Sequence, residues 1–285
     1  MNVEFLIRIS SFALVFAAMA GWEFMAPRRA WAVGRAPRWT NNLGILVVDV
    51  IAVRVLIPTA AVGVALLAAE RGWGLFHLAG LAPALAAILG FLILDLVIYG
   101  QHVVFHKVPV LWRLHRMHHA DLDIDVTTGV RFHPFEILIS LAIKIATVIL
   151  FGIPAVAVLL FEVVLNATSM FNHANVSMPP ALDRVLRLLV VTPDMHRVHH
   201  SILRNETDSN FGFNLPWWDR LFGTYRAVPA AGHQGMTIGL PIFRNRRELR
   251  VDRLLTQPFR DDPAGADDER GPGGKRADPR NPPGR

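Results

Sequence analysis

Cysteine is absent from this chain of 285 residues. Its absence excludes disulfide bonds, thiolate metal ligands and a cysteine nucleophile. A GxGxxG pattern between a strand and a helix, the usual signature of a bound nicotinamide or flavin, is absent too. The net charge is +6, but the arginines are dispersed over loops and the tail. This distribution argues against a nucleic-acid partner and favours anionic lipid headgroups as the partner of the basic residues.

Apolar residues make up 52% of the chain, and they lie in runs too long for a soluble core. Residues 5–25, 44–68 and 78–101 each offer roughly the 20 apolar residues that a membrane-spanning helix needs. A fourth run, 136–172, is interrupted at Gly152-Ile153-Pro154, where proline removes a backbone donor and predicts a helical hairpin. We therefore expect an all-α integral membrane protein with about four transmembrane helices, the last pair forming the hairpin, and a cytosolic helical cap.

The first run also allows a second interpretation. Ala18-Met19-Ala20 is a small-residue pattern of the kind cut by signal peptidase, although the segment before it carries Glu4 and only Arg8. At the other end, the chain from about Asp261 is charged, rich in glycine and proline and nearly free of apolar residues, which is typical of disorder.

Arginines between the apolar runs indicate the orientation. Four of them lie between the first and second runs, whereas the loop between the second and third runs has Arg71 beside Glu70. Positive loops stay in the cytoplasm, so the amino terminus is predicted outside and the histidine-rich segments inside. The four arginines are Arg28, Arg29, Arg35 and Arg38.

Eight of the twelve histidines fall into three clusters. Residues spaced i, i+3 and i+4 project from one face of a helix, so we expect each cluster to aim its imidazoles at a common point. Imidazole binds zinc, copper, iron and nickel, and eight ligands are too many for one ion, so the pattern predicts a di-metal site. The clusters are His102 and His106; His115, His118 and His119; and His196, His199 and His200.

Two polar stripes share the helical spacing i, i+4, i+7, i+11, and we expect them to face each other across the metals. Ionisable groups inside apolar helices usually face a cavity or the protein interior. We take Asp95, Glu162 and Asn166 as candidate catalytic residues, and Asp95 or Glu162 as acceptors for the second ring nitrogen of a ligand. A pair that only holds helices together is the alternative. The stripes are Asp95, Tyr99, His102 and His106, then Glu162, Asn166, Ser169 and His173.

The remaining histidines divide by position. His173 is favoured as a further ligand, and His133 fits either a ligand or a helix-entry role. His77 and His233 lie apart from every cluster and are not expected to bind metal. Lys144, within the hairpin, is expected to snorkel or to pair locally.

The order HxxxH, LHRMHH, RFHPFE, NHAN, TPDMHRVHHS and NFGFNLPWWDRLFGTY resembles the fatty acid hydroxylase and sterol desaturase superfamily of membrane di-iron enzymes, over roughly Asp95 to Tyr225. The resemblance implies a membrane region under a cytosolic cap, two irons, and O2-dependent oxidation of an unactivated C–H bond. It also implies a ligand set at His102, His106, His115, His118, His119, His196, His199 and His200, with His173 as an addition.

On this basis the chain divides into N-terminal transmembrane helices (1–94), a catalytic region (95–258) and a disordered tail (259–285). The expected activity is hydroxylation or desaturation of a lipid drawn from the bilayer, with electrons from a separate donor protein at the basic cytoplasmic face of a bacterial inner membrane. The alternatives are cleavage of ether lipids by an alkylglycerol monooxygenase, or a non-enzymatic role as a metal-binding scaffold or transporter. The aromatic segment Asn210 to Asp219 is expected to hold the third cluster in place.

Overall fold

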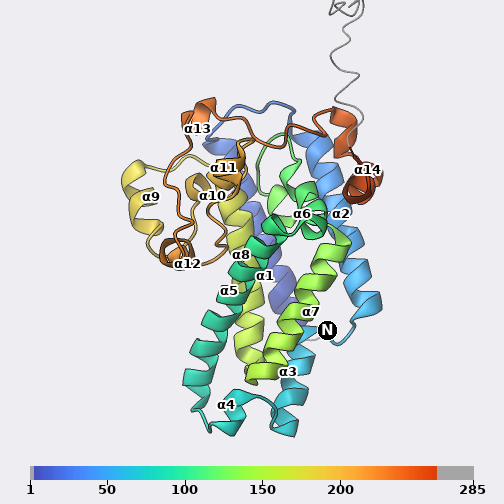
Figure 1. Cartoon of the computed structure of the whole chain (residues 1–285), viewed down its shortest axis with the longest axis vertical. Coiled ribbons are helices and arrows are strands. Elements are labelled where there is room, and N and C mark those ends of the chain that lie inside the picture. The colour runs from blue at the N-terminus through green and yellow to red at the C-terminus, as the bar shows by residue number, and fades with distance from the viewer. Residues whose placement is uncertain (1–2, 262–285) are drawn as a thin grey trace, which may run out of the picture.

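A computed structural model describes residues 3–261, and within that range the chain is helical apart from two isolated β-bridges. The predicted all-α architecture is confirmed. Long upright helices form one end of the molecule and short helices gather at the other (Figure 1). The predicted disordered tail falls largely on residues 262–285, which lie outside the described part.

Among the described residues, five helical segments are long and apolar enough to cross a membrane, whereas about four were predicted. They are the first three predicted runs and both arms of the hairpin, which have 18 and 19 residues. The second predicted run is divided at Pro58 into two helices. The upright helices are α1 (Val3–Met25), α2 (Arg35–Leu56), α3 (Ala60–Arg71), α5 (Pro83–Lys107), α7 (Pro134–Phe151) and α8 (Ala155–His173), and the short α4 (Leu75–Leu78) joins α3 to α5.

Proline and glycine fix where these helices begin and end. Pro83, Pro109 and Pro134 occupy first-turn positions, where a missing N–H costs nothing. Val108 is extended because it precedes Pro109, so α5 stops there and the chain leaves the bundle. Gly152 ends α7 in the left-handed conformation, with φ +68°. The predicted hairpin turn is therefore confirmed.

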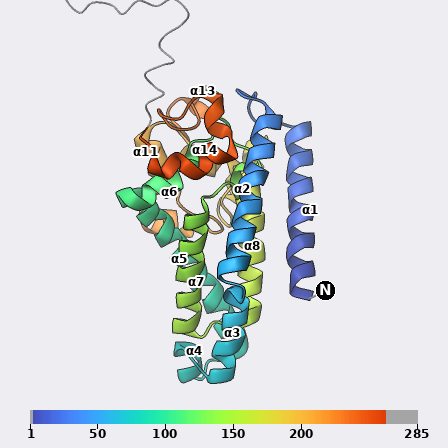
Figure 2. The same cartoon turned by 90° about the vertical axis from the view of Figure 1, so that its right-hand side faces the viewer.

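The same turn packs tightly against the α3–α4 connection at the base of the bundle. A Cβ atom added to Gly74, whose φ is +96°, would lie 2.1 Å from the backbone nitrogen of Gly152. Neither position accommodates a side chain. Apolar residues of α3, α5, α7 and α8 form the core directly above this contact, while α1 packs along α8 at the side of the bundle (Figure 2).

The short elements and the 26–34 segment lie together at the opposite end (Figure 1), and two of these elements, α6 and α10, carry histidine clusters. The expectation that the first arginine-rich loop and the histidine clusters share one side is confirmed, since Arg28 pairs with Asp194 next to the third cluster. The elements of this cap are α6 (Pro109–His119), η1 (Thr128–Val130), α9 (Pro180–Leu186), α10 (Pro193–His199), α11 (Arg204–Thr207), α12 (Trp217–Leu221), α13 (Gly232–Gly235), η2 (Arg246–Leu249), α14 (Val251–Thr256) and η3 (Gln257–Phe259).

A buried ionic network joins α2 to the loop that follows α6. Arg38 is 0% exposed and binds both carboxylate oxygens of Asp121, at 2.7 and 2.8 Å, as well as Asp125. Burial alone would raise the pKa of Asp121, but Arg38 and Arg131 outweigh it and hold that pKa below its usual range. Arg131 is also completely buried and donates to Asn42 of α2. The loop is therefore locked by charge-assisted hydrogen bonds.

The ordered chain continues slightly beyond the predicted domain boundary at 259. Arg260 pairs with Glu248, and Asp261 accepts from Arg113 at 2.9 Å. Both residues therefore belong to the cap.

Candidate metal centre

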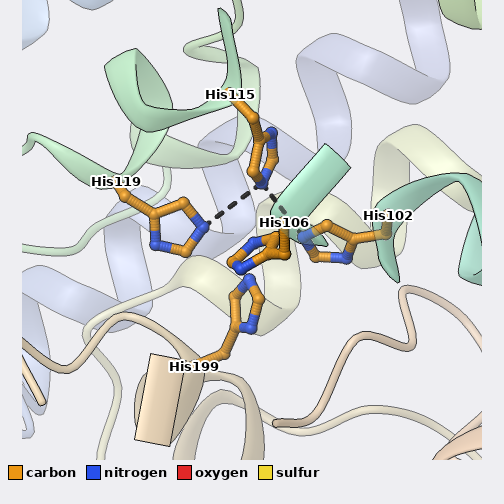
Figure 3. Close-up of side chains that lie close together, drawn as sticks. All are labelled: His102, His106, His115, His119 and His199. Carbon is orange, nitrogen blue, oxygen red and sulfur yellow. Dashed lines mark hydrogen bonds between the residues drawn. The ribbon is translucent and has the colours of Figure 1, made fainter. Parts of the chain in front are cut away.

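Nine buried histidines form two adjacent groups at the cap end of the bundle. Within each group the candidate ligand nitrogens all lie within 4.8 Å of one another. Figure 3 shows the five-histidine group, in which the imidazoles converge from separate helices. The five-histidine group is His102, His106, His115, His119 and His199; the four-histidine group is His118, His173, His196 and His200.

The helical spacing predicted that each HxxHH cluster would point to one place. The structure instead divides both clusters between the two groups. His115 and His119 join the five-histidine group, while His118 joins the other. The third cluster divides the opposite way, with His196 and His200 in the four-histidine group and His199 in the five-histidine group. The physical reason is that the i+3 side chain leaves the helix in a different direction from the i and i+4 side chains, so in each helix it reaches a different group from theirs.

Most of these rings are held through Nδ1, which leaves Nε2 facing the group. Nδ1 of His102 lies 2.7 Å from the Phe211 carbonyl, and Nδ1 of His199 lies 2.7 Å from the Ser209 carbonyl. The corresponding acceptors for His118 and His173 are the carbonyls of Arg131 and Ser169, at 3.0 and 2.7 Å. A proton on Nδ1 fixes the tautomer in which Nε2 has a free lone pair, as a metal ligand requires.

Two carboxylates contact the Nδ1 atoms of further rings. Neither is Asp95 or Glu162, the residues predicted for this role from the polar stripes. Glu136 Oε1 lies 2.7 Å from Nδ1 of His115, and Asp208 Oδ1 lies 3.2 Å from Nδ1 of His106. Among the described residues, Asp95 and Glu162 contact no candidate ligand ring: Asp95 accepts from Trp218, and Glu162 from Arg8 and Lys144. The predicted second-nitrogen contact therefore belongs to Glu136 and Asp208.

The nine residues fit metal ions. A transition metal such as zinc bonds imidazole nitrogen at about 2.0–2.1 Å, so two ligands of one ion lie roughly 3 to 3.4 Å apart. Nε2 of His115 lies 3.0 Å from Nε2 of His102 and 3.2 Å from Nε2 of His119. In the other group, Nε2 of His173 lies 3.1 Å from Nε2 of both His118 and His196.

Unpaired buried nitrogens point to the same conclusion. Nε2 of His106, Nε2 of His199 and both ring nitrogens of His200 are buried without a hydrogen-bond partner among the described residues. Buried polar atoms are rarely left unpaired, and metal ions at the two groups would satisfy one nitrogen of each of these rings.

Burial also keeps the cap histidines uncharged. It lowers the pKa of His118, His119 and His199 well below the usual value, and neighbouring histidines lower it further. The same causes act on the pKa of His196 and His200. Neutral imidazole is the form that binds metal.

The polar stripe on α5 is used to hold the cap. Its Asp95 accepts from Trp218 Nε1 at 2.7 Å, and Tyr99 contacts Thr224 at 2.9 Å. Asp219 of α12 then accepts from the backbone N–H groups of Phe211 and Gly212, at 2.8 and 2.9 Å. The Phe211 carbonyl holds His102, so the aromatic segment positions the first cluster. It also contacts the third cluster's helix, because Asn210 donates to the Met195 carbonyl.

The histidines outside the clusters have structural positions. His133 caps α7 by accepting from Phe135 N and contacts the Leu255 carbonyl, which favours the helix-entry interpretation. His77 and His233 belong to neither group, as expected. His233 lies 3.6 Å from Asp194, and burial lowers its pKa to about 4 despite that carboxylate. Lys144 pairs locally with Glu162 at 2.5 Å, as predicted.

A cavity of about 1040 Å³ lies beneath the five-histidine group and extends between the upright helices. His102 and His115 line its metal end together with Phe132, Phe213 and Glu136. Glu162 and Asn166 line it as well, so a role for them toward a substrate stays a prediction, whereas Asp95 is not among the lining residues. Sequence reasoning did not reveal this cavity.

Residues 87–224 match the fatty acid hydroxylase family. The chain is similar to this family over nearly half of its length. Its similar proteins include an ornithine lipid hydroxylase of Rhizobium tropici, 33% identical over 51% of this chain and 43% of that protein. They also include the alkylglycerol monooxygenase of Homo sapiens, which is 32% identical over 54% of this chain and 33% of that protein. The cholesterol 25-hydroxylase of Rattus norvegicus is 25% identical over 52% of this chain and 51% of that protein.

The match thus spans about half or less of these relatives. No solved structure matches the chain significantly. Within the fatty acid hydroxylase segment lie all nine histidines of the two groups, Glu136, Asp208 and the loop that holds His102.

Glu136→Gln should lower metal affinity or turnover by roughly 10- to 100-fold, the usual effect of losing a carboxylate that orients a ligand histidine. The amide keeps the shape of the side chain but weakens the acceptor for His115 Nδ1. The matched variant Glu162→Gln should keep its metal, because Glu162 contacts no candidate ligand ring. Iron analysis of both purified variants is the measurement, and equal iron loss in the two would contradict the assignment.

Proposed function

We propose that this protein belongs to the fatty acid hydroxylase family and is a membrane-bound di-iron oxygenase that hydroxylates or desaturates a lipid, using O2 and electrons from a separate donor protein. The observation that carries the proposal is the pair of buried histidine groups with their unpaired nitrogens. Two irons held there would supply the O2 activation and oxidising power that no side chain has. The nine histidines of the two groups are the proposed ligands.

The remaining residues define what the protein itself contributes. Glu136, Asp208 and the backbone carbonyls described above fix the ring tautomers, so each of these rings presents a lone pair to its group. Phe132 and Phe213 line the cavity beside His102 and exclude water from the place where a C–H bond would be oxidised. The apolar walls below accept a chain from the bilayer.

Ether-lipid oxidation is the second candidate. Alkylglycerol monooxygenases of three vertebrates are similar to this chain over about half its length. Hydroxylation at the carbon next to an ether oxygen uses the same stoichiometry: one oxygen atom of O2 enters the C–H bond and the other leaves as water, with two electrons and two protons consumed. Lipid analysis of a deletion strain would separate the candidates, through the species that accumulates and the oxidised species that disappears.

Metal analysis tests the proposal directly. Protein expressed with iron should contain close to two irons per chain, because nine neutral imidazoles exceed what one ion can bind. One tightly bound zinc per chain, with no turnover after loading with iron, would overturn the di-iron assignment. A transporter would instead carry polar groups through the whole bilayer thickness, whereas these histidines lie in and next to α6 and α10 and at the cap ends of α5 and α8.

For the orientation, we propose that the histidine end faces the cytoplasm of a bacterial inner membrane, with the electron donor docking on its basic surface. Pro37 lies near the start of α2 at the histidine end, and Gly72 ends α3 at the other. Reporter fusions should therefore give a cytoplasmic signal at Pro37 and an external one at Gly72, since positive loops are retained inside. A cytoplasmic signal at Gly72 would reverse the orientation.

A further inference from the structure

The cavity below the five-histidine group is lined by charged side chains at a depth where charge is costly. At its far end these charges are paired with one another. Arg8 binds Glu4 at 2.9 Å and Glu162 at 2.6 Å, and Lys144 binds the other oxygen of Glu162 at 2.5 Å. This end of the cavity is therefore electrically balanced without any ligand.

Asp49 of α2 is different. It lines the same cavity, is 5% exposed, and has no hydrogen bond or ion pair with any residue that the structure describes. Arg54 also lines the cavity, but it is exposed and makes no ion pair with Asp49. A buried carboxylate without a partner is strongly unfavourable, so an ionised Asp49 requires a donor that the described residues do not provide.

Two other residues that line the cavity also have unpaired acceptors. Glu136, also 5% exposed, gives one oxygen to His115 and leaves Oε2 buried without a partner. Gln101 Oε1 lines the cavity and is unpaired in the same way. Asp49 and Glu136 are close enough to interact electrostatically. Among the described residues lining the cavity, these three have buried unpaired acceptor atoms, and none has a buried unpaired donor.

We propose that Asp49, Glu136 and Gln101 form a subsite for the headgroup of the lipid substrate, and that this headgroup carries a primary ammonium. An ammonium has three donors and no acceptor, which matches three acceptors of which two are carboxylates. This inference rests on the proposed function and names its substrate class: an amphipathic lipid with an amine headgroup.

The position of the subsite also sets how the lipid lies. Glu136 contacts His115 directly, so the headgroup sits next to the proposed irons and the alkyl chains extend away from them into the apolar part of the cavity. The oxidised carbon is therefore one close to the polar end of the lipid. A free fatty acid would bring its carboxylate against three acceptors, and the subsite excludes it in this orientation.

Four single-chain probes of equal length separate charge from hydrogen bonding: dodecylamine, dodecyltrimethylammonium, dodecanol and dodecyl methyl ether. Binding of each to the detergent-solubilised full chain is measured by native mass spectrometry, in iron-loaded and metal-free protein, with iron content determined in parallel. The variants are Asp49→Asn and the matched control Glu70→Gln, whose carboxylate is exposed at the end of α3 outside the cavity.

We expect dodecylamine to bind the wild type roughly 10- to 100-fold more tightly than the ether, the effect of one charge-assisted hydrogen bond, with the alcohol and the quaternary amine between them. Asp49→Asn should remove most of this preference and Glu70→Gln none. Equal binding of all four probes, an unchanged preference in Asp49→Asn, or no binding to the wild type would each overturn the subsite. If Asp49→Asn fails to fold, the ranking of probes on the wild type decides alone.

The same measurements distinguish failure of the subsite from failure of the proposed function. Amine preference in a protein that never contains two irons would leave the subsite standing and overturn the di-iron assignment. Two irons without amine preference would do the reverse.

Discussion

His199→Ala should abolish turnover and release metal, with a loss larger than the roughly 10- to 100-fold that removing an outer hydrogen bond costs. His199 contributes its Nε2 to the five-histidine group, and its Nδ1 hydrogen bond to the Ser209 carbonyl ties α10 to the loop that also holds His102. One substitution therefore removes a ligand and loosens the support of a second. Turnover and iron content in membranes, at matched protein level and with a donor system supplied, are the measurements.

The matched control is His233→Ala. His233 belongs to neither group, and its neighbour Asp194 keeps Arg28 and Arg197 as partners when the imidazole is lost. This variant should keep nearly full activity and both irons. Equal activity of the two variants would show that the histidine groups are not the catalytic centre and would favour the non-enzymatic alternatives.

Arg38→Met should lower the free energy of unfolding by about 3–5 kcal/mol, the usual cost of removing one partner from a buried ion pair. Asp121 and Asp125 would stay buried without their counter-charge. Because total stabilities are only about 5–15 kcal/mol, a large part of the molecule's stability would be lost. Arg131, whose carbonyl holds His118, lies in the same network, so iron content should fall as well.

Arg250→Met is the control for this experiment. Its ion pair with Asp252 is exposed on both sides, and such pairs contribute about 0–1 kcal/mol. Denaturant unfolding of the three proteins in detergent gives the comparison. A destabilisation of Arg38→Met as small as that of Arg250→Met would mean that the network adds no net stability.

The candidate ligands could be predicted from the sequence because histidine is a chemically specific ligand and because HxxHH spacing recurs. The division of each cluster between two groups could not be predicted, since it depends on where α6 and α10 lie relative to one another. Helical spacing tells which residues share a face, and His115 and His119 indeed share one. It does not tell what that face meets.

The same limit explains why the sequence favoured Glu162, and not Glu136, as the carboxylate that contacts a ligand ring. Both are single carboxylates in apolar helices, and the stripe on α8 favoured Glu162 because it lies in line with His173. The rotation of α8 turns Glu162 toward Arg8 and Lys144, while the proline-initiated first turn of α7 brings Glu136 to His115. The membrane hairpin, by contrast, was predicted correctly, because Gly152 and Pro154 interrupt the helix through local backbone chemistry alone.

The sharing of α6 and α10 by the two histidine groups has a consequence for assembly. Each of α6 and α10 supplies ligands to both groups, so an ion that enters one group orients the helices that build the other. The second ion then binds to ligands whose ordering cost has already been met, which is positive cooperativity. Chains should accordingly be found empty or fully loaded, with few half-loaded molecules between them, and a mono-metal version of this protein should be difficult to obtain by deleting ligands on one side.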